Sequence, residues 1–253
     1  MVGGTTGESA TLRDAELREL LLRACQLLRG QLIVIAGAGT SSTAATVERV
    51  AWLSELPIDA LLLVTPAYNR PPPEGLYPHF AAAAAAARKP LLLYNVPART
   101  AIDMKPATVA RLAQVAGIVG IKEAVAETER VRELVARCPP GFVVLSGDDA
   151  TARAAVAAGA RGVISVTANV APRAMSQMLA AALRGDAERA VELDAALSAL
   201  HRELFVETNP IPVKWLLAHM GLIGPGIRLP LTPLAAEHAA GLLAAARAAG
   251  LLA

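Results

Sequence analysis

Residues 117–124 read GIVGIKEA, a short aliphatic run that ends in a lysine followed by a glutamate. The run does not alternate with polar residues, which is typical of strands that are buried on both faces. Further runs of the same kind occur before and after it. The six predicted strands are Leu32–Ala36, Ala60–Val64, Leu91–Asn95, Ile118–Lys122, Phe142–Ser146 and Gly162–Val166.

Longer segments rich in alanine and leucine separate these runs. The alanine run Ala81–Ala87 lies in one of them, and we interpret it as helix rather than as a membrane span because alanine favours helices. The predicted helices are residues 11–29, Ser42–Leu56, Glu74–Ala87, Pro106–Ala116, Glu127–Ala136 and Ala150–Ala158. Strands and helices alternate with a repeat of roughly 20–30 residues, which predicts an α/β fold with a parallel sheet, of the (β/α)8 TIM barrel type.

The strand count falls short of the roughly eight strands that close such a barrel. The missing strands should precede residue 30, where residues 11–29 form one predicted helix and Met1–Gly4 provide only the last part of a strand. We therefore expect a barrel that lacks its first strand and helix and most of its second strand.

The chain shows no linker that divides it into independent parts. We expect the incomplete barrel at residues 1–170 and a C-terminal helical region at residues 171–253. Within that region, Arg184–Asp186 should break a helix and Asn209–Pro212 should form a proline-rich turn.

Composition excludes several classes of protein. The 253 residues include 24 Lys+Arg and 22 Asp+Glu, and no clustered basic stripe typical of a nucleic-acid binder is present. With 54% hydrophobic residues the chain is not intrinsically disordered. No membrane span or signal peptide is recognisable, and Cys25 and Cys138 are expected to be reduced thiols. We expect a soluble, cytoplasmic protein with no nucleic-acid or membrane partner.

Lys122 is the most informative candidate residue. The other lysines, Lys89, Lys105 and Lys214, lie beside prolines or in turns, whereas Lys122 ends a predicted buried strand. Burial of an ammonium group is costly unless the group is paired or deprotonated. A neutral amine in such a place is a good nucleophile toward carbonyls, so one interpretation is a Schiff-base lysine. The other is a lysine paired with Glu123 or Asp148.

Polar residues at the ends of other strands belong to the same expected site, because active sites of parallel α/β folds lie at the carboxyl ends of the strands. Tyr68 and Tyr94 could pass protons, although core packing is the alternative for both. Arg99 could bind a carboxylate or be a solvated loop arginine. The turn Gly4–Gly7 could hold an anion on its N–H groups or cap a helix.

Two other kinds of site are disfavoured. Gly37 and Gly39 follow a predicted strand, but the third glycine of a dinucleotide-binding motif is absent because residue 42 is serine. Asp148 and Asp149 have no neighbouring histidine or cysteine in the sequence, so a metal site is not predicted. We expect neither an organic cofactor nor a metal.

Taken together, the motifs of the chain resemble the dihydrodipicolinate synthase family, also called 4-hydroxy-tetrahydrodipicolinate synthase. The segments that carry the resemblance occur in the family's order over nearly the whole chain. They are GTTGESATL (4–12), TPAYNRP (65–71), YNVPART (94–100), GIKEA (120–124), LSGDDA (145–150), GVISVTANV (162–170) and NPIPVKW (209–215).

The resemblance implies a lyase of lysine and diaminopimelate biosynthesis that condenses pyruvate with L-aspartate 4-semialdehyde. Lys122 would form the imine with pyruvate, and Thr5, Tyr68 and Tyr94 would relay protons. Substrate-binding roles would fall to Thr6 for the pyruvate carboxylate and to Arg99 for the semialdehyde carboxylate. The backbone at Gly147 and Ile164 would line the imine pocket.

The resemblance also implies self-association. The family tyrosine that matches Tyr68 reaches in from a neighbouring subunit, which requires a dimer at least, and the family is typically tetrameric. Two alternatives stay open from the sequence: another pyruvate-dependent aldolase, and a truncated non-catalytic remnant that acts as a partner subunit of an intact paralogue.

Feedback inhibition by lysine is expected to be weak or absent. In many bacterial members the inhibitory lysine binds between subunits through histidine, asparagine, glutamate and tyrosine side chains. Ser9 and Ala10 fit that site, but the other matching positions hold residues that cannot replace those side chains: Asp14, Leu17, Ser41, Ala45 and Ala67. An inhibition constant for lysine in the micromolar range, measured on the purified chain, would contradict this expectation.

Overall fold

The computed structural model describes all residues, 1–253, and contains one five-stranded parallel sheet. The strands lie in the order of the sequence: β1 (Ile35–Gly37), β2 (Ala60–Val64), β3 (Leu91–Asn95), β4 (Ile118–Glu123) and β5 (Val143–Ser146). The helices are α1 (Asp14–Leu28), α2 (Thr43–Ser54), α3 (Pro73–Ala86), α4 (Pro97–Thr100), α5 (Pro106–Leu112), α6 (Thr128–Arg137), α7 (Ala152–Ala157), α8 (Pro172–Leu183), α9 (Ala187–Glu203), α10 (Ile211–His219) and α11 (Ala236–Ala248), with short 3₁₀ helices η1 (Ser9–Thr11) and η2 (Thr167–Asn169).

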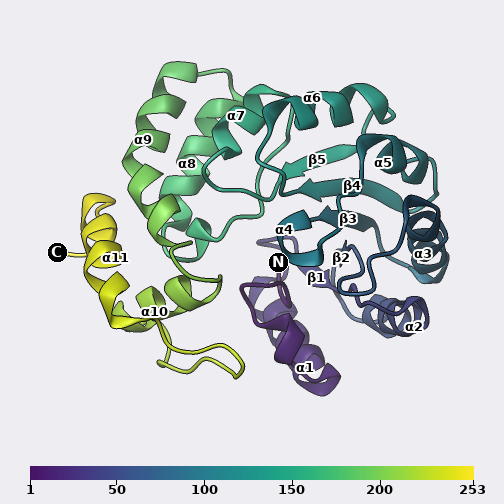
Figure 1. Cartoon of the computed structure of the whole chain (residues 1–253), viewed down its shortest axis with the longest axis horizontal. Helices are drawn as coiled ribbons and strands as arrows, with labels where there is room; N and C mark the ends of the chain where they lie inside the picture. The colour runs from purple at the N-terminus through teal and green to yellow at the C-terminus, as the bar shows by residue number, and fades with distance from the viewer.

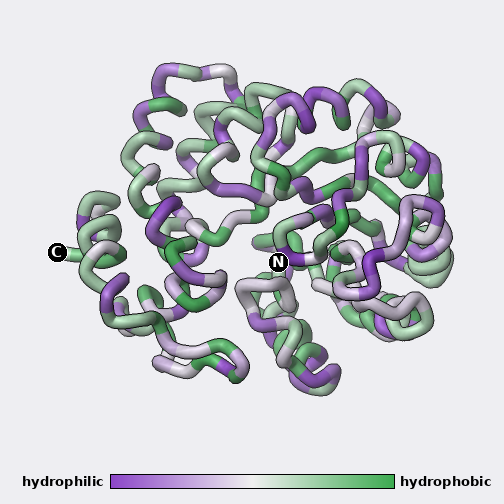
Figure 2. Tube along the Cα trace, viewed as in Figure 1, coloured by the Kyte–Doolittle hydropathy of each residue, from purple (hydrophilic) through white to green (hydrophobic).

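The alternation of strands and helices confirms the α/β fold predicted from the sequence. Helices α2, α3, α5 and α6 cover the outer side of the sheet, while α8 to α11 lie on the opposite side of the molecule from α2 and α3 (Figure 1). The strands form a mostly hydrophobic layer beneath the helices (Figure 2). Because every strand runs in the same direction, the carboxyl ends of all five lie at one edge of the sheet.

The predicted strand Gly162–Val166 is wrong as an extended element. Only Val163 forms a bridge, to Ser146 of β5, and the segment has no strand on its other side. The amide groups of Val166 and Thr167 donate to the carboxylate of Asp149, so the backbone leaves the sheet there and enters η2. An apolar run without a second neighbouring strand therefore gives only a single bridge.

The predicted strand Leu32–Ala36 begins three residues too early. Strand β2 starts at Ala60, which pairs with Ile35, so Leu32 and Ile33 have no strand to pair with and remain exposed. The amide of Val34 donates instead to the carboxylate of Asp59 at 2.7 Å.

The sheet is open at both ends in this chain. At one end Val2 forms a single bridge to Ala36 of β1, and at the other end Val163 forms the bridge to β5. No strand pairing joins Val2 to Val163. The order of strand segments is nevertheless that of a (β/α)-barrel, each strand being followed by at least one helix on the outside.

Two clusters of buried apolar side chains hold these layers together. One joins α1, the sheet and helices α2, α3, α5 and α6, and includes Phe80, Leu93 and Ile121. The other joins α7 to the C-terminal helices α8 to α11 and includes Met178 and Leu242. The C-terminal helices thus pack on one another and on the last part of the barrel.

Local signals account for several helix ends. The predicted break at Arg184–Asp186 is confirmed: Gly185 adopts φ 78°, and the side chain of Asp186 accepts a hydrogen bond from Arg189 N at the start of α9. The predicted turn at Asn209–Pro212 ends earlier than expected, because α10 begins at Ile211. No helix combines the length and the hydropathy that crossing a membrane requires.

Candidate active site

Lys122 lies near the carboxyl end of β4, and the parallel register places it directly beside Tyr94 of β3. Its side chain is 8% exposed, and the amine lies 4.2 Å from the centre of the Tyr94 ring. Burial lowers the pKa of the Lys122 amine to about 8, with Asp149 opposing this shift and Arg99 adding to it. The amine is therefore partly neutral near neutral pH and available as a nucleophile.

The alternative pairing of Lys122 with Glu123 or Asp148 is absent from the structure. The lysines that form ion pairs are Lys105 and Lys214. Asp148 accepts hydrogen bonds from the amide and the hydroxyl of Thr151, at 2.9 and 2.7 Å. Lys122 is thus buried without a salt-bridge partner.

Glu123 lies on the opposite face of β4 from Lys122, since successive side chains of a strand alternate. Its carboxyl group accepts hydrogen bonds from the side-chain amide of Asn95 at 3.0 and 3.1 Å and from the amide of Val125 at 2.8 Å. Burial raises the pKa of Glu123 to about 7. Asn95 also donates to Asp103, so this network joins the ends of β3 and β4 behind the Tyr94–Lys122 pair.

Tyr94 is almost fully buried, and burial raises the pKa of its phenol. The positive charge of Arg99 and a hydrogen bond with the Thr5 side chain act in the opposite direction. The phenol therefore keeps its proton at neutral pH, where it is able to donate it to an oxygen atom next to the Lys122 amine.

The turn at Thr5 and Thr6 has two free backbone donors. Gly7 N donates to Gly4 O, and Glu8 N to Thr5 O, but the amides of Thr5 and Thr6 donate to no carbonyl of the chain. Adjacent free N–H groups in a turn form a concave site that suits a carboxylate. This arrangement favours anion binding over the plain helix cap that the sequence also allowed.

Asn209 joins this turn to the arginine, a role that the sequence did not predict. Its side-chain amide donates to the hydroxyl of Thr6 at 3.1 Å, and its backbone carbonyl accepts from Nη2 of Arg99 at 3.0 Å. Arg99 lies in α4, which follows β3. In the sequence, Asn209 was only the first residue of a predicted proline-rich turn and of one of the family segments, with no role assigned to it.

The C-terminal region also holds the turn in place. Glu8 forms an ion pair with Lys214 of α10 and accepts a hydrogen bond from Arg228 N at 2.7 Å. The segment around residues 209–228 therefore contacts the first turn of the chain, and helices far away in sequence support the carboxylate-binding candidate.

Gly147 follows β5 and borders Lys122, and Ile164 packs on the cluster of apolar side chains that contains Tyr94. An added Cβ at Gly147 would lie 2.9 Å from Cε of Lys122 and 2.8 Å from Cβ of Ala124, so glycine leaves the space that the lysine side chain occupies. Ile164 follows the Val163 bridge and donates its amide to Ser146 O at 2.9 Å. Gly147 thus lies just past the carboxyl end of β5, the strand next to β4, and Ile164 lies just past the Val163 bridge.

Tyr68 is the sequence-predicted residue that this chain does not bring to the others. Its side chain is 97% exposed, and its backbone adopts φ 69°, a conformation that residues with a Cβ rarely adopt. Ser41 donates to Ala67 O at 2.9 Å and Asn69 donates to Ser41 O at 2.8 Å, which fixes the loop on both sides of the tyrosine. Tyr68 thus projects outward from a held loop.

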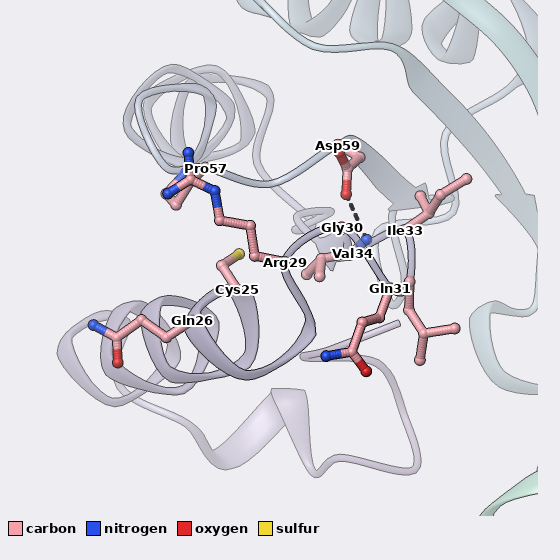
Figure 3. A pocket seen from close by; sticks show the side chains of 10 residues that line it. Cys25, Gln26, Arg29, Gly30, Gln31, Ile33, Val34, Pro57 and Asp59 are labelled. Carbon is pink, nitrogen blue, oxygen red and sulfur yellow. Dashed lines mark hydrogen bonds between the residues drawn. The ribbon is translucent and has the colours of Figure 1, made fainter.

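Neither a metal-binding cluster nor the main surface depression coincides with the candidate site. No group of three or more His, Cys, Asp or Glu side chains is arranged to hold a metal ion. A depression of about 620 Å³ lies at the amino end of β1, where Cys25, Arg29 and Asp59 border it (Figure 3). Lys122 lies at the carboxyl ends of the strands, so this depression is separate from the candidate site.

The fold and the site together define a class. A parallel barrel sheet that presents a buried amine of lowered pKa, a protonated phenol and a free pair of backbone donors at the carboxyl ends of its strands is typical of barrel enzymes that form Schiff bases.

Comparison with known proteins identifies the family. Residues 1–249 match the dihydrodipicolinate synthetase family. The 4-hydroxy-tetrahydrodipicolinate synthase of Methylococcus capsulatus is 53% identical over 249 residues, which are 98% of this chain and 86% of that protein. The protein of the same name from Alkalilimnicola ehrlichii is 54% identical over 235 residues, 93% of this chain and 81% of its own length. The chain belongs to the dihydrodipicolinate synthetase family.

Solved structures agree with this assignment. The crystal structure of the chloride-inhibited dihydrodipicolinate synthase from Acinetobacter baumannii, complexed with pyruvate, has a TM-score of 0.97 and 45% sequence identity, and the match covers 99% of this chain and 86% of that one. The dihydrodipicolinate synthase from Thermotoga maritima also has a TM-score of 0.97, at 39% identity, with 99% of this chain and 86% of that one covered. The barrel-type fold is therefore confirmed.

The lowered pKa of Lys122 predicts how its reactivity depends on pH. The amine is mostly protonated below pH 8 and mostly neutral above it, whereas a free lysine amine changes near pH 10.4. Trace labelling with acetic anhydride at a series of pH values, read by peptide mass spectrometry, should therefore give a midpoint near pH 8 at Lys122. A midpoint above pH 10, like that of a free amine, would contradict the burial argument.

Proposed function

We propose that this chain catalyses the reaction for which its relatives are named, the synthesis of 4-hydroxy-tetrahydrodipicolinate from pyruvate and L-aspartate 4-semialdehyde. The observation that carries the proposal is the buried amine of Lys122, which has no salt-bridge partner and a pKa lowered to about 8. The reaction is a lyase step of lysine and diaminopimelate biosynthesis, which in cells would occur in the cytoplasm.

Pyruvate binds first in this proposal. The free amides of Thr5 and Thr6 hold its carboxylate, and its ketone carbon then faces Lys122. The neutral amine adds to the ketone to give a carbinolamine. The phenol of Tyr94 donates a proton to the departing oxygen, which leaves as water, and the nitrogen remains as a cationic iminium. Thr5, whose side chain lies beside Tyr94, relays a replacement proton to the phenolate.

The second half of the reaction forms the carbon–carbon bond. Loss of a proton from the methyl group of the iminium gives an enamine, which attacks the aldehyde carbon of the semialdehyde. The guanidinium of Arg99, held by the carbonyl of Asn209, binds the semialdehyde carboxylate. The amino group of the semialdehyde then attacks the imine carbon, and the ring closes as the C–N bond to Lys122 breaks.

The backbone around the lysine shapes the imine pocket. Gly147 leaves room for the lysine side chain, and the carbonyl region of Ile164 lines the pocket from the neighbouring segment. None of these steps draws on a metal or an organic cofactor, since the iminium itself accepts the electrons of the breaking C–H bond.

Self-association is part of the proposal. Tyr68 is a proton-relay residue in the resemblance, yet here it lies outside the site of its own chain, exposed on a loop with a left-handed backbone conformation. We propose that it completes the site of a second copy, in a dimer or a tetramer. The strain of such a backbone conformation is then compensated by contacts across the interface.

The proposal predicts a covalent adduct. Incubation of the purified chain with pyruvate, followed by borohydride reduction, should add one reduced pyruvyl group per chain, and a peptide map should place it on Lys122. Lys122→Arg should abolish the adduct because the guanidinium stays protonated, whereas Lys105→Arg, at an exposed site, should leave it unchanged.

The acceptor distinguishes the proposed reaction from that of another pyruvate-dependent aldolase. Adding aspartate semialdehyde before reduction should consume the imine and lower the yield of trapped adduct, whereas acceptors that lack its carboxylate and amine should leave that yield unchanged. An adduct on another residue, or an adduct that the semialdehyde does not discharge, would overturn the proposed activity.

Gly147→Ala tests the geometry of the pocket. The added methyl group would lie within 3 Å of Lys122 Cε, so the amine must move from its place beside Tyr94. We expect at least a tenfold lower rate of adduct formation. Gly226→Ala is the matched control, because a Cβ there meets nothing within 4 Å. Equal rates for the two variants, with equal urea midpoints, would show that the pocket is looser than the structure indicates.

A further inference from the structure

Asn209, in the segment between α9 and α10, contacts a binding group for each of the two proposed substrates. It is only 6% exposed. Its side-chain amide lies 3.1 Å from the hydroxyl of Thr6, in the turn proposed to hold pyruvate. Its backbone carbonyl lies 3.0 Å from the guanidinium of Arg99, the group proposed to bind the semialdehyde. The side chain of Asn209 takes part in none of the proposed steps, so its contact with Thr6 needs a reason of its own.

The two distances between the side chains of Asn209 and Thr6 show which group donates. The amide nitrogen Nδ2 is 3.1 Å from Thr6 Oγ1, whereas the amide oxygen Oδ1 is 3.4 Å from the same atom. Hydrogen bonds donated by N–H groups are usually about 2.9–3.0 Å long, and those donated by hydroxyl groups about 2.7–2.8 Å. The shorter separation therefore suits the amide as donor, and the longer one is too long for a good bond from the hydroxyl. The hydroxyl of Thr6 thus accepts a hydrogen bond and keeps its own proton free.

A free hydroxyl proton at this place has an obvious use in the turn to which it belongs. The backbone amides of Thr5 and Thr6 donate to no carbonyl of the chain. The two oxygens of a carboxylate together accept up to about four hydrogen bonds, so a carboxylate held by those two amides has room for a third donor. The hydroxyl of Thr6 belongs to the same residue as one of the amides.

Asn209 is held firmly enough to orient a hydroxyl group. The amide of Ile211 donates to Thr208 O at 2.9 Å, which closes a turn around Asn209 at the start of α10, and α10 packs in the buried C-terminal cluster. The Thr5–Thr6 turn has a second attachment to the same helix through the ion pair of Glu8 with Lys214. Loss of the Asn209 side chain would therefore leave the turn attached and change only the contact with the hydroxyl.

We propose that Asn209 is a positioning residue for pyruvate: its side-chain amide donates to the Thr6 hydroxyl and thereby directs the hydroxyl proton to the carboxylate of pyruvate. This inference rests on the proposed function. The backbone carbonyl of the same residue holds Arg99, so the side chain serves one substrate and the backbone serves the other. Removal of the side chain should weaken the binding of pyruvate and spare the binding of the semialdehyde.

Asn209→Ala tests this division because it removes the amide and keeps the backbone carbonyl. The KM for pyruvate should rise about fivefold, the effect of one neutral hydrogen bond, while kcat and the KM for the semialdehyde stay the same. Asn169→Ala is the matched control. Asn169 is exposed and its amide donates to Val166 O at 3.0 Å, within its own turn, so this variant should leave both KM values unchanged.

A second variant keeps the size of the side chain. Asn209→Asp cannot donate to Thr6, and its carboxylate would accept the hydroxyl proton and repel the carboxylate of pyruvate. The KM for pyruvate should therefore rise more than in Asn209→Ala. A KM for pyruvate that stays unchanged in both folded variants, or rises no more than the KM for the semialdehyde, would overturn the proposal, because Asn209 would then only support the fold.

A double-mutant cycle with Thr6→Val shows whether Asn209 acts through the hydroxyl. Thr6→Val removes the hydroxyl and keeps the backbone amide. In this background, Asn209→Ala should cause no further rise in the KM for pyruvate, because the group that it positions is already absent. A further rise as large as in the unchanged background would contradict the proposed path through Thr6.

L-Lactate separates this inference from the proposed function, because it has a carboxylate but no ketone for Lys122 to attack. Its binding, measured by calorimetry, should be about fivefold weaker in Asn209→Ala than in the unchanged chain. If the unchanged chain bound lactate but formed no pyruvate adduct, the proposed function would fail, while weaker lactate binding in the variant would still support the role of Asn209. Equal lactate binding in both chains, or none in the unchanged chain, would overturn the inference.

Discussion

Burial of the Lys122 amine is the interaction on which the candidate site depends. The parallel register of β3 and β4 places Tyr94 beside Lys122 on one face, and because side chains alternate, it places Asn95 beside Glu123 on the other face. The hydrogen bonds of the second pair fix the strand ends that carry the first pair. The pairing of β3 with β4 thus places the reactive amine beside Tyr94 and also forms the Asn95–Glu123 hydrogen bonds that hold the two strand ends together.

Much of the site was predictable from the sequence because the end of each apolar run marks the end of a strand. Lys122, Tyr94 and Arg99 follow apolar runs, and parallel strands bring such ends together. The placement of Tyr68 depends on an exposed loop, so strand ends do not position it. The role of Asn209 depends on contacts with Thr6 and Arg99, which are far away in the sequence, and no local pattern predicts such contacts.

The two wrong strand predictions have a common physical cause. An apolar run reports burial, whereas a strand also needs neighbours with which to pair its backbone. Leu32 and Ile33 precede the start of β2 and have no pairing partner, and residues 162–166 have a neighbour on one side only. In the second case the Asp149 carboxylate accepts hydrogen bonds from the amides that would have continued the strand.

The central claim is that the Lys122 amine and the Thr5–Thr6 amides act on one substrate molecule. A crystal structure of the chain soaked with pyruvate tests this most directly. The account predicts continuous density from Nζ of Lys122 to the former ketone carbon, with the carboxylate within hydrogen-bond distance of the two amides. Pyruvate density separate from Lys122, or a carboxylate bound away from Thr5 and Thr6, would contradict it.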